Sequence, residues 1–257
     1  MKKQEWFYDE DFWEHYAPVI FTGSRMAEAP EAADAVTRLA ALNLYEKKTA
    51  KSGPLILDLC CGFGRITLEL ARRGFIATGV DITEYYLCKA RQDAAYEKLK
   101  IEFIKEDIRS FKRENTYDTA INLYNSFGYF ENEKDNLLFL KNVYSSLKEG
   151  GSFIMDVMGK EIAVRDFTEA DWFEISGLTF LVNNCPVDSW TSQRCRWILL
   201  DQYGKHREKI FTQRLYAASE LRSLFLEAGF SAVELYGGWD ESPYDDKAHT
   251  LIAVGRK

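Results

Sequence analysis

The chain has 257 residues, 40 acidic against 33 basic side chains, and a formal net charge of −7 at pH 7. This length can bury one substantial core as a single α/β domain. A composition of 46% hydrophobic and 28% charged residues is typical of globular proteins and excludes intrinsic disorder. The negative charge argues against a protein that binds nucleic acid by neutralising phosphates.

Cysteine and histidine form no disulfide or metal-binding pattern in the sequence. The five cysteines are odd in number and include no CxxC pair, and the three histidines are scattered. We therefore expect reduced thiols and no metal. No apolar segment reaches the roughly 18 residues of a membrane span, and no signal peptide is recognisable at the start of the sequence. We expect a cytoplasmic protein with no membrane partner.

The first fifty residues predict helices. Residues 5–21 are dense in aromatic and acidic side chains at mixed helical spacing, which is typical of short amphipathic helices. Residues 31–45 carry an apolar stripe with a period near 3.6, which predicts a helix that packs against a sheet.

From residue 55 the chain alternates strand-like and helix-like segments. Alternation at this spacing predicts parallel strands joined by helical crossovers, so the fold class is α/β with a doubly wound sheet. The predicted strands are 55–60, 75–80, 101–104, 117–122 and 152–157, and the predicted helices are 65–73, 83–99 and 134–147.

The alternation stops after residue 160. Four β-rich segments separated by turn residues predict antiparallel hairpins; they are 173–175, 179–182, 194–200 and 209–215. A helix capped by Ser219 and ended by Gly229 follows, and strands at 232–236 and 249–254 complete a seven-strand sheet. We predict one domain, 1–257, whose parts are an N-terminal helical lid (1–50), a cofactor-binding core (51–160), an antiparallel β insertion (171–215), and the last helix and strands (216–257).

A glycine turn follows the first predicted strand. At Gly62 and Gly64 the missing Cβ atoms allow the backbone to approach a ligand. Asp81 ends the next strand, 19 residues after Gly62, where a carboxylate can accept hydrogen bonds from both hydroxyls of a ribose. Asp58 would pay a desolvation cost at a strand end unless it faces a partner. The pattern predicts a ligand that contains a nucleoside.

Nicotinamide dinucleotides and S-adenosylmethionine both bind at such a turn. The dinucleotide fingerprint has a third small residue where this chain has Thr67, and it has no particular use for Asp58. The ammonium group of S-adenosylmethionine is a suitable partner for Asp58. The pattern Asp58-x-x-x-Gly62-x-Gly64 resembles the first motif of class I S-adenosylmethionine-dependent methyltransferases, which more often have glycine where Cys60 stands.

This resemblance covers residues 50–160 and implies further cofactor contacts. Asp107 would bind the adenine amino group and Ile108 would supply a backbone amide, although Asp107 as a solvated turn residue is an alternative. Ile82 would pack on the adenine face, and Leu123 would also belong to the cofactor-binding residues.

The segment 121–130 follows the fourth strand, at the edge where doubly wound sheets bind ligands. It resembles small-molecule methyltransferases, particularly amino-sugar N-methyltransferases with a similar Ser-Phe/Ile-Gly-Tyr stretch. It lacks the Asn-Pro-Pro-Tyr signature of enzymes that methylate amide or nucleobase nitrogens. Tyr124 and Tyr129 are candidates for positioning the acceptor. No catalytic base is assigned, because methyl transfer requires mainly in-line alignment and exclusion of water.

The aromatic N-terminal segment resembles the lid that often covers the cofactor in this family. Tyr16 and Trp13 are candidates for contact with the sulfonium by cation–π attraction, and Tyr16 also for positioning the acceptor. A purely hydrophobic cover over the sheet is the alternative. By its position, Arg25 would bind the methionine carboxylate as a fork donor. Asp156 has no accompanying acid–amide pair, so we predict no metal ligand there.

The acidic loop 237–246 bears on the acceptor. We expect its four acids near the mouth of the cavity, where they would attract a protonated amine, with a solvated turn as the alternative. We predict methyl transfer to the amine nitrogen of a small molecule, and O-methyl transfer is the alternative. Alternatives of other classes are a nicotinamide-dependent oxidoreductase and a non-catalytic S-adenosylmethionine-binding protein. The insertion is expected to cap the cavity or to form a homodimer interface.

Overall fold

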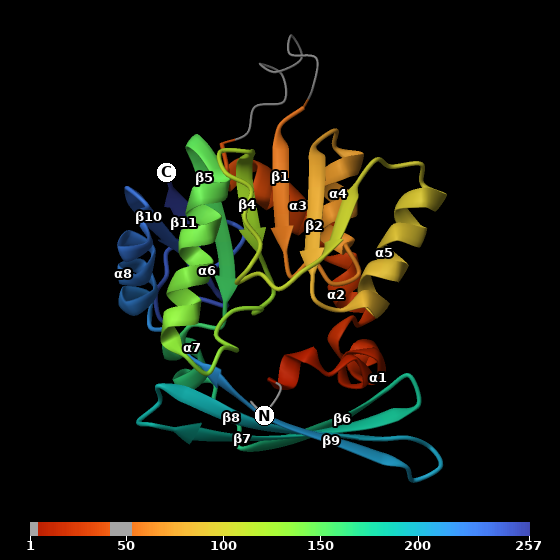
Figure 1. Cartoon of the computed structure of the whole chain (residues 1–257). Coiled ribbons are helices and arrows are strands. Elements are labelled where there is room, and N and C mark those ends of the chain that lie inside the picture. The colour runs from red at the N-terminus through yellow and green to blue at the C-terminus, as the bar shows by residue number, and fades with distance from the viewer. Residues whose placement is uncertain (1–4, 42–52) are drawn as a thin grey trace.

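The computed structural model describes residues 5–41 and 53–257. Its main sheet has seven strands in the order β10-β11-β5-β4-β1-β2-β3 (Figure 1). Neighbouring strands are parallel except at β11, which is antiparallel to both β5 and β10. The strands are β1 (Leu55–Leu59), β2 (Ile76–Asp81), β3 (Glu102–Lys105), β4 (Tyr117–Asn122), β5 (Leu147–Val157), β10 (Ala232–Tyr236) and β11 (Leu251–Arg256).

Helices cover both faces of this sheet, as a doubly wound fold requires. Successive side chains of a strand point to opposite faces, so Ile56 packs with α3 and α4 while Leu57 packs with α6 and α8. The α/β sheet of seven strands predicted from the sequence is thereby confirmed. The helices are α3 (Ala29–Leu39), α4 (Arg65–Arg72), α5 (Glu84–Tyr96), α6 (Glu133–Ser146), α7 (Lys160–Arg165) and α8 (Ala218–Ala228).

Some predicted boundaries and caps are wrong. The helix predicted over 31–45 is α3, which ends at Leu39; positions 42–45 lie outside the described residues. Ser219 does not cap α8, because the capping residue is Ala217, whose N–H donates to the Glu220 carboxylate at 2.8 Å. The last strand begins later than predicted, because the N–H of His249 donates to the carbonyl of Gly237 at 2.9 Å instead of pairing with β5.

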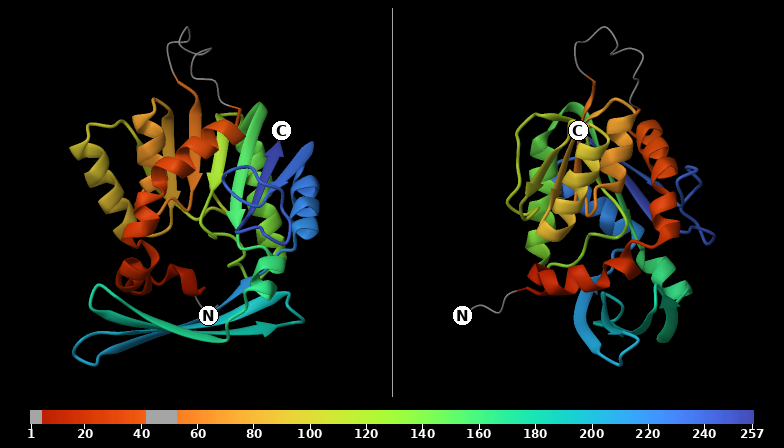
Figure 2. Two further views of the ribbon diagram at one scale, coloured as in Figure 1. Left: turned by 180° about the vertical axis from the view of Figure 1, so that it is seen from behind. Right: turned by 90° about the vertical axis from the view of Figure 1, so that its right-hand side faces the viewer.

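A second sheet lies below the carboxyl ends of the parallel strands (Figures 1 and 2). It is antiparallel with the order β6-β7-β8-β9, which confirms the predicted insertion. The strands are longer than the apolar segments that predicted them, because polar residues extend the hairpins. They are β6 (Ala170–Ile175), β7 (Leu178–Val187), β8 (Ser192–Leu200) and β9 (His206–Arg214).

The N-terminal segment lies between the two sheets (Figure 2). It forms a short 3-10 helix η1 (Trp6–Tyr8) and two helices, α1 (Glu10–Ile20) and α2 (Gly23–Ala27). The buried Tyr16 of α1 donates from its hydroxyl to the carbonyls of Trp197 and Arg207, at 3.1 and 2.9 Å. These bonds attach the helix to β8 and β9 of the insertion. None of the described helices is long and apolar enough to cross a membrane.

We predict that Tyr16→Phe destabilises the fold. The substitution removes two hydrogen bonds to carbonyl oxygens of the insertion, which costs about 1–3 kcal/mol in the free energy of unfolding. Urea denaturation measures the change. The matched control is Tyr96→Phe at an exposed tyrosine of α5, which should leave stability unchanged. Equal stability of the two variants would show that the hydroxyl of Tyr16 does not hold the insertion.

Candidate functional site

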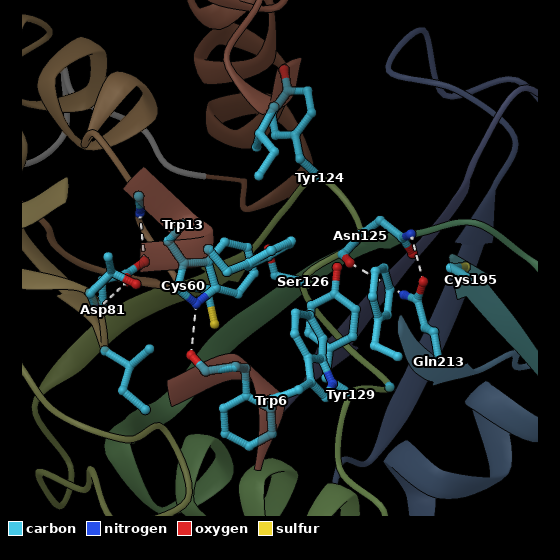
Figure 3. A pocket seen from close by; sticks show the side chains of 18 of the residues that line it. Trp6, Trp13, Cys60, Asp81, Tyr124, Asn125, Ser126, Tyr129, Cys195 and Gln213 are labelled. Atoms are coloured by element: carbon cyan, nitrogen blue, oxygen red, sulfur yellow. Dashed lines mark hydrogen bonds between the residues drawn. The ribbon is translucent and has the colours of Figure 1, made fainter. Parts of the chain in front are cut away.

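A cavity of about 380 Å³ opens between the main sheet and the insertion. Its walls come from the loops after β1 to β4, from the N-terminal helices and from the inner face of the insertion. Figure 3 shows Asp81 at one end and Gln213 at the other, with Tyr129 between them. The insertion therefore caps the cavity, one of the two roles predicted for it.

The turn after β1 brings backbone to the cavity wall. Cys60, Gly62 and Gly64 all have left-handed φ values, +59°, +56° and +72°. This conformation disfavours Cys60 and explains why glycine suits that position. A Cβ atom on Gly62 would lie 2.7 Å from the ring of Phe21, so only glycine fits there. Gly64 does not line the cavity; its missing Cβ makes room for Phe103 and Ala90.

Asp81 is held by backbone amides at the carboxyl end of β2. Its carboxylate accepts hydrogen bonds from the N–H groups of Gly62 and Thr83, both at 2.8 Å. Burial raises the pKa of Asp81, and the two amides oppose this shift by favouring the charged form. The carboxylate lines the cavity, so its remaining lone pairs are available to hydroxyl donors.

Asp107 lies at the same end of the cavity, beneath η1. It accepts hydrogen bonds from the Tyr8 hydroxyl at 2.5 Å and from Arg109 Nη2 at 2.6 Å. Burial raises the pKa of this carboxyl, but these donors lower it below its ordinary value. Asp107 is therefore a partnered group and not a solvated turn residue. Ile82 and Ile108 line the cavity beside it, as predicted.

Besides Gly64, three of the predicted cofactor-binding residues do not line the cavity. Tyr16 is buried against the insertion, where its hydroxyl is used by backbone carbonyls. Leu123 is buried in the core on the α3 side of the sheet. Asp58 is buried, accepts a hydrogen bond from the Thr67 hydroxyl of α4 at 2.5 Å, and does not line the cavity. Direct contact of these three with the cofactor is thus not supported.

Arg25 and Tyr124 lie at the cavity, as predicted. Arg25 donates from Nη1 to the Ile20 carbonyl at 3.0 Å. The ring of Tyr124 carries the Arg65 guanidinium 3.5 Å above its centroid. Tyr124 and Asn125 have left-handed φ values of +60° and +61°, which places local strain in the loop after β4.

Asp156 holds this strained loop and is not arranged as a metal ligand. It accepts hydrogen bonds from the Tyr124 N–H at 3.1 Å and from the Thr250 hydroxyl. Within residues 5–41 and 53–257 no group of three or more His, Cys, Asp or Glu side chains is arranged to hold a metal ion.

The sequence did not predict which residues of the insertion line the cavity. Gln213 donates to the Phe127 carbonyl at 3.0 Å and accepts from the Asn125 amide at 3.3 Å, which ties β9 to the loop after β4. The period-2 alternation along β8 and β9 could have identified the inward-facing side chains. Those of the insertion that line the cavity are Phe180, Val182, Asn184, Gln193, Cys195, Trp197, Phe211 and Gln213.

The acidic loop 237–246 is not part of the cavity wall, contrary to our expectation. Although it follows β10 at the predicted edge, it folds toward α3, where Glu241 pairs with Arg38 at 3.2 Å and Trp239 packs on the α3 side of the core. The Tyr244 hydroxyl donates to Glu161 at 2.9 Å. These contacts direct the loop away from the site.

Comparisons with known proteins agree with this geometry. Residues 56–151 match the family model described as "Methyltransferase domain". A protein of Geobacillus sp. (strain WCH70) named as a methyltransferase is 23% identical over 84% of this chain and 88% of its own. A glycine/sarcosine N-methyltransferase of Aphanothece halophytica is 26% identical over 79% of this chain and 76% of its own. An S-adenosylmethionine-dependent methyltransferase structure from Clostridium acetobutylicum ATCC 824 has a TM-score of 0.75 at 17% identity and covers 96% of this chain and 97% of its own.

The chain is an S-adenosylmethionine-dependent methyltransferase with a Rossmann-like fold. The site is chemically suited to this cofactor. A buried carboxylate at Asp81, already oriented by two amides, matches a diol donor, and Gly62 lines the cavity beside it. The apolar side chains of Ile82 and Ile108 match a flat base.

We predict that Asp58→Asn stabilises the ligand-free protein at alkaline pH. Burial raises the pKa of Asp58 to about 7, against 3.8 as the ordinary value. The folded state therefore holds this proton more tightly, and the resulting stability is complete below pH 4 and lost as the pH rises through 7. Asparagine avoids burying a charge while it keeps an acceptor for Thr67.

Urea denaturation at pH 5 and pH 8 checks this prediction. The stability of Asp58→Asn relative to the wild type should increase from pH 5 to pH 8. The control Asp188→Asn, at an exposed turn, should show no such trend. A stability difference for Asp58→Asn that is independent of pH would mean that Asp58 does not titrate between these values.

Proposed function

We propose that this methyltransferase transfers the methyl group of S-adenosylmethionine to the amine nitrogen of a small molecule. The observation that carries the proposal is the distribution of charge in the cavity. Its charged lining residues are Arg25, Asp81, Glu106 and Asp107, and the acids all lie where β2 and β3 end. The wall contributed by the insertion is aromatic, aliphatic and amide in character.

The charged end is the proposed cofactor half of the cavity. Asp81 would accept hydrogen bonds from the ribose hydroxyls, and Asp107 would bind the adenine amino group through lone pairs that Tyr8 and Arg109 leave unused. Ile82 and Ile108 would enclose the base. Arg25 remains the proposed partner of the methionine carboxylate, since it lines the cavity.

The bound cofactor supplies a sulfonium that makes its methyl group electrophilic. The protein has to align the acceptor nitrogen at roughly 3–3.5 Å from that carbon and to exclude water. Tyr129 is the proposed positioning residue, because it lies between the two ends of the cavity and none of the described residues hydrogen-bonds to its hydroxyl (Figure 3). Burial raises the pKa of Tyr129, so its neutral hydroxyl can accept an N–H without acting as a base.

An amine suits these walls better than an alcohol or a phenol. A hydroxyl acceptor has to lose a proton to a base, and the wall from the insertion supplies neither carboxylate nor histidine. A neutral amine already carries the attacking lone pair, and a cavity of low polarity favours this neutral form. The distant likeness to a glycine/sarcosine N-methyltransferase supports the same choice.

A homodimer through the insertion and a cytoplasmic location stay predictions. Trp172 and Tyr203 of the insertion are exposed, at 63% and 85%, so its outer surface offers apolar contacts for another copy.

We predict that Asp81→Ala weakens binding of S-adenosylhomocysteine by about 2–4 kcal/mol, because two charge-assisted hydrogen bonds are lost. Isothermal titration calorimetry measures this change, and NADH should give no binding heat. Asp81→Asn, which keeps one acceptor oxygen, should lose less. The control Asp240→Ala removes a carboxylate outside the cavity and should bind like the wild type. Unchanged affinity in Asp81→Ala would mean that Asp81 does not face the ribose.

We predict that Tyr129→Phe lowers kcat about tenfold, the effect of losing one orienting hydrogen bond. The affinity for S-adenosylhomocysteine should not change. With an amine acceptor, kcat/KM should rise with unit slope up to the pKa of the free amine, because no enzyme base precedes transfer. The control is Tyr203→Phe at an exposed turn. Turnover of phenols or alcohols but of no amine would contradict the proposed function.

A further inference from the structure

We propose that the acceptor is a small amine with a flat aromatic body and no carboxylate. This inference rests on the proposed amine methyl transfer and concerns the part of the cavity that lies beyond Tyr129. Two observations support it. Aromatic rings enclose this half of the cavity, and most amide N–H donors on its wall already bind acceptors inside the protein.

Aromatic rings surround this half of the cavity. Trp6 of η1 stacks on Phe211 of β9 with ring centroids 4.4 Å apart and an angle of 22° between the planes. Tyr129 meets Trp6 edge-on at 4.9 Å, and Trp197 meets Phe211 edge-on at 5.1 Å. Rings in such arrangements favour a further ring that can stack or pack edge-on. The enclosure therefore fits a planar apolar group.

The two glutamines on this wall have used both of their amide N–H donors inside the protein, and Asn125 has used one. Gln213 donates to the Phe127 carbonyl, and Asn125 donates to Gln213. Gln193 donates from Nε2 to the Asn184 oxygen at 3.0 Å. The Trp6 indole N–H has no acceptor among the described residues, but it is buried and faces no open space.

What this half offers a ligand is therefore mostly hydrogen-bond acceptors. Gln193 is oriented by its bond to Asn184, and no described residue donates to its Oε1. Ser126 donates to the Leu123 carbonyl at 3.1 Å and keeps lone pairs on its oxygen. An acceptor molecule with an N–H or O–H donor on its ring system can bind here.

A carboxylate in this half would lack a cation. The basic side chains on the inner face of β9 belong to contacts with α1: Lys209 pairs with Asp9 at 2.5 Å, and Arg207 contacts His15 at 2.6 Å. Neither lines the cavity. Burying an unpaired carboxylate is costly, and a sugar ring would leave several hydroxyls without partners. Amino acids and amino sugars are thus disfavoured as acceptors.

The size of the cavity sets a further limit. A volume of about 380 Å³ is near the lower end of the range for ligand sites, roughly 300–1,000 Å³. Because cofactor and acceptor share this space, a small acceptor fits better than a large one.

Methyl transfer from S-adenosylmethionine to three probes tests the proposal. Tryptamine has the proposed features, tryptophan adds a carboxylate to the same frame, and glucosamine replaces the aromatic body by a sugar. We expect kcat/KM for tryptamine to exceed the other two by at least about 30-fold, from the cost of burying unpaired polar groups. Equal or faster methylation of tryptophan or glucosamine would overturn the proposal while leaving amine methyl transfer intact.

Variants of β9 and β8 identify the wall that carries the preference. Phe211→Leu should raise KM for tryptamine about tenfold through lost ring contacts, with unchanged affinity for S-adenosylhomocysteine. The matched control is Ile210→Leu, one residue earlier on the exposed face of β9. Gln193→Met should abolish the preference for tryptamine over 1-methyltryptamine, which lacks the ring N–H. An unchanged KM in Phe211→Leu contradicts the aromatic enclosure as the binding site.

Binding to the protein saturated with S-adenosylhomocysteine separates the two proposals. Saturable binding of tryptamine without its methylation, together with methylation of a phenol such as 5-hydroxyindole, would support the aromatic acceptor and refute the amine as the reacting group. Absence of both binding and turnover of tryptamine at millimolar concentration would overturn the aromatic acceptor.

Discussion

The hydrogen bond from the Gly62 N–H to the Asp81 carboxylate joins the carboxyl ends of the first two strands. It keeps the turn after β1 in its left-handed course and aims the carboxylate into the cavity. A buried carboxylate is costly unless it is hydrogen-bonded, and the second amide, from Thr83, completes its support. The same bonds that stabilise this turn therefore orient Asp81 toward the cavity, where its free lone pairs suit a ligand with two hydroxyls.

The cavity is formed through contacts between distant parts of the chain. Tyr16 joins α1 to β8 and β9, and Gln213 joins β9 to the loop after β4. That loop contains Tyr124 and Asn125 in strained left-handed conformations, which Asp156 holds from the opposite side. Strain of this kind persists where surrounding bonds determine the backbone. The insertion is thus part of the site, because it fixes the loop on which the acceptor end depends.

The sequence predicted the sheet, the insertion and much of the cofactor end, because these depend on local periodicity and on residues that end neighbouring strands. Asp81 and Asp107 line the cavity for this reason. The contacts of Tyr16 could not be predicted, because its hydroxyl binds backbone carbonyls some 180 residues away and no local pattern reveals them. The acidic loop was misplaced because its direction depends on Arg38 of α3. The sequence motif also did not reveal that the Thr67 hydroxyl is a partner of Asp58.

Charge on a loop and charge in a cavity have different consequences, and this distinction decides the choice of acceptor. The acids of 237–246 contribute to the field around the protein, but solvent and Arg38 moderate them. Inside the cavity a single unpaired charge would be more costly, because the mostly apolar walls solvate a charge less well than bulk water does. Gln193 donates to Asn184 there and keeps its own oxygen available, so a ligand that cannot donate to this oxygen, or that carries an unpaired charge, is disfavoured. A neutral amine with an aromatic body leaves the fewest polar groups without a partner.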